Sequence, residues 1–326
     1  MRLCAEPRRG AKIADVEADG VVRAPRVRAG DRVRLVSPAS WPERAAVDEQ
    51  VAILEGWGLV PEVGEHVFDR WGFQAGREAD RIADVDDAFR DPGVRAIVTT
   101  RGGAGAYRIA DGLDLDAVRA DPKPLVGFSD ITNLHLALWQ HARLVSVHGC
   151  LVGVRAAASV RRLLMEPRPC VVTRDPDAYT AAVEVPGRAT GPLLGGNLRE
   201  VTGAIGAGLP DLRDAIVFLE DLRHVGLGQV DRQLTHLRRA GALDGIAGVA
   251  LGLFTGFDDH EDRGWYLLDV LRDRLGDLGV PVLGGLPAGH GGIGADGRPD
   301  QVALALGATA TLDTAAGTLT VGPCVR

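Results

Sequence analysis

Short apolar runs alternate with longer amphipathic stretches over the first half of the chain. Four runs have the length and β-branched content of buried strands: 31–36, 59–63, 95–100 and 124–128. Helical spacing predicts helices between or after them: 42–57, 78–89 and 129–141. Strands that alternate with helices indicate a mainly parallel sheet with helices on both faces, a Rossmann-like α/β domain.

The pattern weakens over residues 151–190, where prolines accumulate, and we interpret this segment as a connection. A second α/β unit follows, with strands and helices predicted at 191–197, 215–219, 229–239, 246–253 and 265–275. The tail shows short strand patterns only: 280–283, 302–306, 309–312 and near 318. We therefore expect an extension over 1–28, a first domain over 29–150, and a smaller, β-barrel-containing domain over 191–326.

Composition narrows the class of protein. The 326 residues carry a net charge of −7, with 46% hydrophobic and 25% charged residues, as in ordinary globular proteins. A basic cluster is lacking, which argues against a nucleic-acid partner, and an apolar run long enough for a membrane or a secretory signal is lacking too. We expect a cytoplasmic protein. Its four cysteines show no CxxC spacing, so the sequence predicts neither a metal site nor a cofactor.

Ser129 is the most suggestive single residue. It stands between an apolar strand and a helix, where a tight turn lifts a hydroxyl above the sheet and the next N–H groups can stabilise an oxyanion. The segment 127–131 lacks the second glycine of the G-x-S-x-G elbow, and Ser129 and Asp130 are also ordinary N-cap residues. Spacing alone leaves both readings open.

A glycine-rich turn over 101–105 lies at the same edge of the predicted sheet. It matches neither G-x-G-x-x-G nor a P-loop, so a phosphate cradle is unsupported and a plain turn is the alternative. If Ser129 is reactive, an N–H of Gly102 or Gly103 is a natural second oxyanion donor, because only glycine lets backbone approach a carbonyl so closely.

A serine nucleophile needs a base and a group that orients the base. Among eight histidines, His290 is flanked by glycines beyond a strand, a setting that predicts exposure in a cleft. Glu220 ends the strand 215–219 and could orient it, although strand-end acids are often only solvated. A pair of His148 with Cys150 has the wrong spacing for a base and a nucleophile, and we interpret the other histidines as structural.

Several segments in order resemble the LD-carboxypeptidase family of serine peptidases, which includes murein tetrapeptide LD-carboxypeptidases and microcin C self-immunity peptidases. They are residues 28–40, 100–105, 122–132, 147–149, 194–198, 217–221, 230–234 and 289–290. The resemblance spans about residues 28–314. It departs from the family at Ala104, where an aromatic residue is common, at Cys150, where proline is common, and over 291–301.

The resemblance implies a role for each candidate. Ser129 would be the nucleophile, Glu220 the acid and His290 the base, with the N–H groups of Asp130 and Gly103 as oxyanion donors. It also implies a Rossmann-like domain followed by a domain with a small β-barrel, a homodimer, and no metal. Substrate contacts are expected from Arg101, Gly102, Asn197 and Arg232, with Arg101 or Arg232 as the positive group for a terminal carboxylate.

Three functions remain open at this point. The first is a carboxypeptidase that releases a C-terminal D-residue from muropeptide tetrapeptides. The second is an immunity-type hydrolase of peptidyl or aminoacyl nucleotide amides, which would need an aromatic side chain from 151–179 or Trp71 to stack on a base. The third is a binding protein for small molecules that has lost its catalytic site.

Overall fold

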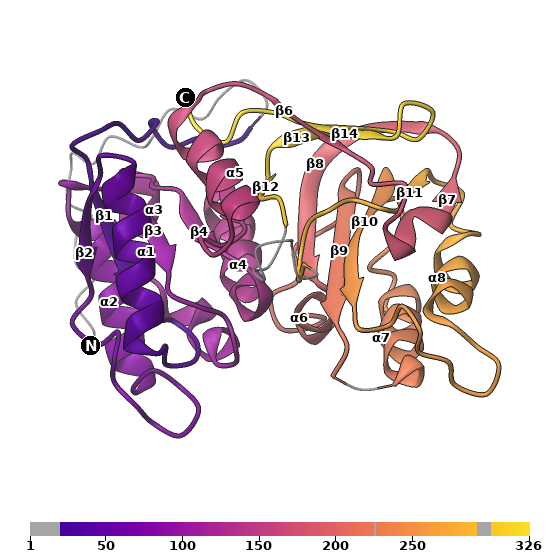
Figure 1. Ribbon diagram of the computed structural model, residues 1–326, viewed down its shortest axis with the longest axis horizontal. Coiled ribbons are helices and arrows are strands. Elements are labelled where there is room, and N and C mark those ends of the chain that lie inside the picture. The colour runs from indigo at the N-terminus through magenta and orange to yellow at the C-terminus, as the bar shows by residue number, and fades with distance from the viewer. Residues whose placement is uncertain (1–19, 225, 292–300) are drawn as a thin grey trace, which may run out of the picture.

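The computed structural model describes residues 20–224, 226–291 and 301–326. It forms two halves, each built on one sheet (Figure 1). The first sheet has six strands in the order β12-β5-β4-β3-β1-β2. Their bounds are β1 Arg32–Val36, β2 Val60–Val63, β3 Val94–Thr99, β4 Leu125–Gly127, β5 Ser146–His148 and β12 Leu304–Leu306. Strands β1 to β5 pair in parallel, which confirms the mainly parallel sheet predicted from the sequence.

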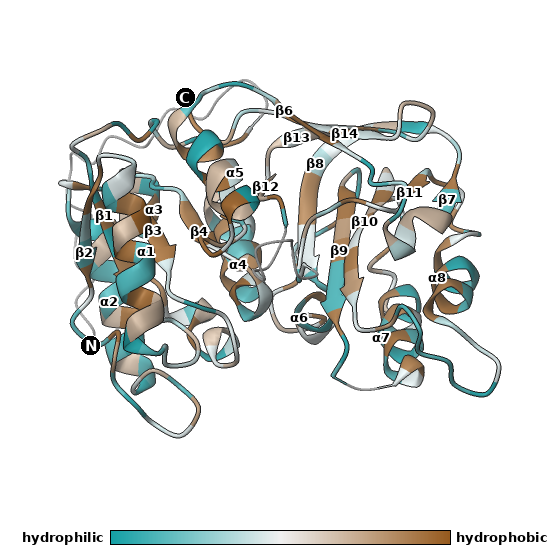
Figure 2. Ribbon diagram, in the orientation of Figure 1, coloured by the Kyte–Doolittle hydropathy of each residue, from teal (hydrophilic) through white to brown (hydrophobic). Residues whose placement is uncertain are grey.

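The helices of this half bury one face against the sheet or against a neighbouring helix. Their bounds are α1 Arg44–Gly56, α2 Glu78–Arg90, α3 Leu115–Ala120, α4 Thr132–Ala142 and α5 Val154–Met165. In α1 the buried side chains are Val47, Gln50 and Leu54, at helical spacing. The central strands β3 and β4 are almost entirely buried, and Figure 2 shows both as hydrophobic. The sequence placed α1, α2 and strands β1 to β4 to within one or two residues, whereas it gave no bounds for α3, α5 or β5.

The second sheet has eight strands in the order β6-β14-β13-β8-β9-β10-β11-β7. Their bounds are β6 Cys170–Thr173, β7 Glu184–Val185, β8 Arg188–Asn197, β9 Ile216–Leu222, β10 Gly248–Thr255, β11 Val282–Leu283, β13 Thr309–Asp313 and β14 Thr318–Val321. The helices of this half are α6 Leu198–Gly203, α7 Leu227–Arg239 and α8 Leu267–Leu275. The curled sheet agrees with the expected β-rich second unit, and no helix in the described ranges is long and apolar enough to cross a membrane.

Three segments differ from the expectations. Residues 20–28 belong to the packed body, because Val22 bridges to Leu144 and Val27 is buried, so only 1–19 of the expected extension lie outside the described residues. The segment 151–190 contains α5, β6 and β7, and β6 pairs with β14. Strand β12, expected with the tail, instead pairs with β5 in the first sheet and ties the two halves together.

Candidate active site

Ser129 lies on a strained turn between β4 and α4. Its φ of 64° is in the left-handed region, which non-glycine residues enter at a cost and which is concentrated at functional sites. Ser129 is the first residue of a single 3₁₀ turn, Ser129–Ile131, and the N-cap of that turn is Phe128. The Ser129 hydroxyl contacts His290 instead of capping the turn. Ser129 therefore does not act as the side-chain N-cap of this turn, which was the alternative to a reactive serine.

The glycine turn packs directly against this serine. A Cβ atom added to Gly102 would lie 2.8 Å from the Ser129 Cβ, and one added to Gly103 would lie 2.3 Å from the Ser40 Oγ. Gly103 also has a φ of +113°, which side chains rarely adopt. Ser40 holds the turn by accepting a hydrogen bond from the Ala104 N–H at 3.1 Å. Glycine at both positions is what lets the turn lie beside the hydroxyl.

His290 and Glu220 complete a chain of contacts that begins at Ser129. The Nε2 atom of His290 lies 3.1 Å from the Ser129 Oγ, and its Nδ1 atom lies 2.7 Å from Oε2 of Glu220. The same Oε2 accepts the backbone N–H of His290 at 2.8 Å. Gly289, with a φ of +107°, lets the chain turn here, since an added Cβ would lie 2.5 Å from the Glu220 Cβ. Three residues separated widely in sequence thus form one hydrogen-bonded array.

Burial sets the electrostatics of this array. Burial alone would lower the pKa of His290, but the charge and hydrogen bond of Glu220 outweigh it and hold the pKa above its ordinary value. Glu220 is fully buried, which would raise the pKa of its carboxyl, and the contacts to His290 reverse that shift and keep it lowered. The pair therefore favours an ionised carboxylate beside an imidazole that accepts a proton readily.

Further side chains support Glu220. Figure 2 shows β9 becoming hydrophilic toward the end where Glu220 and Asp221 lie. Asn197 donates from Nδ2 to Oε1 of Glu220 at 3.3 Å and to Asp221 at 3.1 Å, while its own oxygen accepts the Arg199 N–H at the start of α6. Asn197 is only 5% exposed. The structure thus places it behind the acid, where it orients the carboxylate, and not in the expected contact with substrate.

A cavity of about 630 Å³ opens in front of Ser129 and His290. Arg101 and Gly102 line it, as the sequence predicted for substrate contacts. Arg232 does not, because it projects from α7 into a separate surface hollow beside Thr235. Its place on the exposed side of an amphipathic helix removes it from the cavity.

Other lining residues were missed from the sequence. Arg199 and His224 line the cavity from the second half, and Glu43 and Gln50 line it from the first. The sequence did hold one signal for Arg199. It comes two residues after Asn197, where β8 ends and α6 begins, and ligands bind at the carboxyl ends of parallel strands. His224 is among the histidines interpreted as structural, and nothing in its local sequence indicated the cavity.

His148 does not pair with Cys150. Its imidazole is fully buried behind Glu220, with Nε2 at 3.8 Å from Oε1, and burial lowers its pKa to about 4. Cys150 instead accepts a hydrogen bond from Gln301 at 2.9 Å. The structure agrees with the rejection of a cysteine–histidine site, and residues 292–300 of the atypical segment after His290 lie outside the described residues.

Comparison with known families and proteins gives one consistent result. The model of the LD-carboxypeptidase N-terminal domain matches residues 33–149, and that of the LD-carboxypeptidase C-terminal domain matches residues 190–312. A Streptomyces coelicolor protein provisionally named a carboxypeptidase is 37% identical over 92% of this chain and 96% of its own length. The probable murein peptide carboxypeptidase of Bacillus subtilis is 32% identical over 90% of this chain and 92% of its own length.

Solved structures share the two-domain α/β fold. The muramoyltetrapeptide carboxypeptidase from Oxalobacter formigenes superposes with a TM-score of 0.78, at 24% identity, over 90% of this chain and 100% of that one. A microcin C7 self-immunity protein in its wild-type state superposes with a TM-score of 0.80, at 21% identity, over 92% of this chain and 98% of that one.

Proposed function

This chain belongs to the LD-carboxypeptidase family and is a carboxypeptidase hydrolase, and from that premise we propose that Ser129, His290 and Glu220 are its catalytic triad. The observation that carries the proposal is the continuous array from the Ser129 hydroxyl through both ring nitrogens of His290 to the buried Glu220 carboxylate. A nucleophile, a base and an orienting acid in this order constitute the geometry of a serine hydrolase.

The chemistry is acyl transfer to water. His290 Nε2 takes the Ser129 proton while Oγ attacks the carbonyl carbon, and Glu220 stabilises the imidazolium that forms. The N–H groups of Asp130 and Gly103 hold the oxyanion, consistent with the glycine turn that packs against Ser129. The imidazolium then gives its proton to the leaving amine as the C–N bond breaks. Water, deprotonated by His290, hydrolyses the acyl-enzyme and restores the serine.

We propose a murein tetrapeptide as the substrate, with release of its C-terminal D-residue. Relatives named murein peptide and murein tetrapeptide carboxypeptidase support this substrate class. A C-terminal carboxylate needs a cation, and Arg101 and Arg199 both line the cavity in front of Ser129. Action in the cytoplasm and assembly as a homodimer stay predictions, and light scattering on a sizing column tests the second.

The nucleotide alternative has less support. One related structure is a microcin C7 self-immunity protein in complex with aspartyl sulfamoyl adenosine. In this chain the aromatic residues expected to stack on a base lie elsewhere: among the described residues Trp71 does not line the catalytic cavity, and Tyr179 lines a different one. The contacts from Ser129 through His290 to Glu220 also argue against a binding protein that has lost its catalytic site.

One paired assay decides between the substrates. The enzyme is incubated separately with the tetrapeptide L-Ala-γ-D-Glu-meso-diaminopimelate-D-Ala and with aspartyl sulfamoyl adenosine, and products are followed by mass spectrometry. We expect loss of D-alanine from the tetrapeptide and slow or no cleavage of the nucleotide. Cleavage of the nucleotide with an intact tetrapeptide would overturn the proposed substrate.

A further inference from the structure

Arg81, on α2, is a charged side chain that the fold has buried almost completely. It is 1% exposed, and the mechanism above does not use it. Its acceptors are two backbone carbonyl oxygens and one amide. Nη1 donates to Pro38 at 2.5 Å and to Gly105 at 2.9 Å, and Nη2 donates to Oε1 of Gln74 at 3.2 Å. Burial lowers the pKa of Arg81, because the interior solvates a guanidinium less well than water does. A buried cation is costly, so its retention points to the segments that its donors hold in place.

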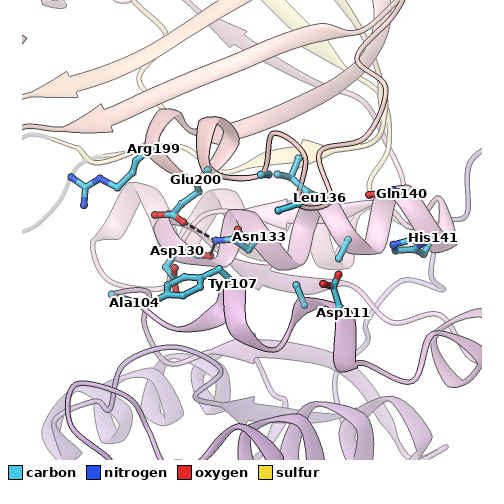
Figure 3. A pocket seen from close by; sticks show the side chains of 17 residues that line it. Ala104, Tyr107, Asp111, Asp130, Asn133, Leu136, Gln140, His141, Arg199 and Glu200 are labelled. Carbon is cyan, nitrogen blue, oxygen red and sulfur yellow. Dashed lines mark hydrogen bonds between the residues drawn. The ribbon is translucent and has the colours of Figure 1, made fainter. Parts of the chain in front are cut away.

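Arg81 and Asp130 hold the two ends of one peptide unit. The carbonyl oxygen of Gly105 accepts the bond from Arg81, and the N–H of Ala106, which belongs to the same peptide unit, donates to Oδ2 of Asp130 at 2.7 Å. Figure 3 shows the Asp130 carboxyl group beside the segment 104–107. A Cβ added to Gly105 would lie 2.9 Å from Nη1 of Arg81, so a side chain there would push the guanidinium away. The two contacts act along the dipole of the peptide and fix both its position and its orientation.

This peptide unit lies between the two proposed oxyanion donors. On one side, Gly103 stands two residues before Gly105 in the glycine turn. On the other side, Asp130 holds the unit through its side chain, while its own backbone N–H is the second proposed donor. The path through the peptide unit therefore fixes one donor relative to the other, and Arg81 anchors the middle of that path. An oxyanion hole stabilises a transition state only when its donors are set in position beforehand.

The same guanidinium reaches the segment that flanks the glycine turn. Pro38 accepts its shortest bond, and two residues further on the Oγ of Ser40 accepts the Ala104 N–H at 3.1 Å. Gln74, the third acceptor, pairs with Ser40 in an isolated bridge and is also 1% exposed. All three acceptors of Arg81 thus lie in the glycine turn or in the segments beside it.

We propose that Arg81 is a positioning residue of the oxyanion hole, which acts through the Gly105 carbonyl group to set the spacing of the two N–H donors. The inference rests on the proposed function. The hydrogen bonds of the triad include none of the acceptors of Arg81, so the triad is retained when the guanidinium is removed. The expected defect is therefore a loss of transition-state stabilisation without a loss of substrate binding.

The test replaces Arg81 and follows D-alanine release from the tetrapeptide used above. Each kcat is divided by the fraction of sites that a fluorophosphonate labels at completion, so unfolded molecules do not count. Arg81→Met should lower this kcat by about 100-fold, the effect of a displacement of about 1 Å near a reacting group. KM should stay at the wild-type value because the oxyanion forms only in the transition state. The pH at which activity falls on acidification should stay there too, because His290 keeps its bond to Glu220.

Two further variants separate positioning from packing. One nitrogen, Nη1, binds both carbonyl oxygens, so the ammonium of Arg81→Lys can replace it but cannot replace the Nη2 bond to Gln74. Its kcat should be intermediate, at least about threefold below the wild type. Arg23→Met is the matched control, because Arg23 is 6% exposed and donates to the Pro323 carbonyl at 3.0 Å, and neither residue lines the catalytic cavity. It should keep the wild-type kcat per labelled site.

Failure of this inference can be told apart from failure of the proposed function. An active wild type with an equally active Arg81→Met overturns the positioning role and leaves the function standing, and so does an equal loss of kcat in Arg23→Met. If Arg81→Met does not fold, Arg81→Lys decides: a lowered kcat with an unchanged KM supports the role, and a wild-type kcat overturns it.

A second readout does not depend on the substrate. If the tetrapeptide is not cleaved, the proposed substrate fails, and the variants are compared by the rate constant of fluorophosphonate labelling, which uses the same oxyanion hole. Slower labelling of Arg81→Met than of Arg23→Met supports the positioning role, and equal rates overturn it. A wild type that is not labelled refutes the triad and the positioning role together.

Discussion

Replacement of Glu220 by glutamine removes one charge from the centre of the proposed triad with almost no change in volume. In the wild type, Oε2 accepts two bonds from His290, at 2.8 and 2.7 Å, and Oε1 accepts one from Asn197 at 3.3 Å. An amide cannot satisfy all three donors. If its oxygen keeps the bonds to His290, its NH₂ group opposes the Asn197 NH₂ group; if it turns over, NH₂ faces both donors of His290.

Either orientation removes the negative charge that stabilises the imidazolium. The second also favours the tautomer with the proton on Nε2, which cannot accept the proton of Ser129. An amide at the acid position of a triad lowers kcat by about 10⁴-fold, which corresponds to about 5 kcal/mol of activation free energy. We expect a loss in kcat of this size for Glu220→Gln. KM should change much less, because Glu220 is not one of the described residues that line the catalytic cavity.

The assay follows D-alanine release from the tetrapeptide by liquid chromatography and mass spectrometry. Asp84→Asn is the control, since Asp84 is a buried carboxylate outside the catalytic cavity that accepts the His66 N–H, and it should keep the wild-type kcat and acid limb. Wild-type activity should fall on acidification as His290 is protonated, at a pH set by its raised pKa. In Glu220→Gln the residual activity should persist to lower pH, because the group that raises this pKa is weakened. A variant within tenfold of the wild type, with an unshifted acid limb, would refute the assigned role of Glu220.

Two other substitutions test the turn and the core. Gly102→Ala should lower kcat by about 100-fold or more by displacing an oxyanion donor, because the new Cβ lies 2.8 Å from the Ser129 Cβ. Gly56→Ala, with no atom within 4 Å of its added Cβ, is the control and should match the wild type; equal kcat in both variants argues against the turn's role. Phe218→Ala should destabilise the fold by about 3–5 kcal/mol in denaturant unfolding, since its side chain is 0% exposed. A loss below about 1 kcal/mol contradicts the packing described for the second half.

Local patterns predicted strands β1 to β4 and helices α1 and α2 because each of these carries its own signal, whereas β5 was not predicted. The helix α1 buries Val47 and Leu54 at helical spacing, and β3 is a continuous apolar run, as expected for a strand covered on both faces. The strand pattern at 302–306 located β12, but not the sheet to which it belongs. Its pairing with β5 joins residues about 160 positions apart, and periodicity carries no information about such partners.

The candidate site, too, was predicted in part from local sequence and in part only from the structure. Ser129 and His290 could be proposed from their turns and Glu220 from its strand end, and the family resemblance implied a role for each. The choice between cap and nucleophile needed the backbone, where Ser129 has a φ of 64° and Phe128 holds the N-cap. The expected substrate contact of Asn197 did not appear, because its side chain turns inward to Glu220.

Covalent labelling of the serine tests the central claim most directly. The wild-type enzyme is treated with a fluorophosphonate, and the modified peptide is identified by tandem mass spectrometry. Ser129→Ala and Ser146→Ala, the latter at a buried serine outside the catalytic cavity, are the paired variants. The account predicts modification at Ser129 in the wild type and in Ser146→Ala, and none in Ser129→Ala. An unlabelled wild type, or equal labelling of Ser129→Ala, would contradict it.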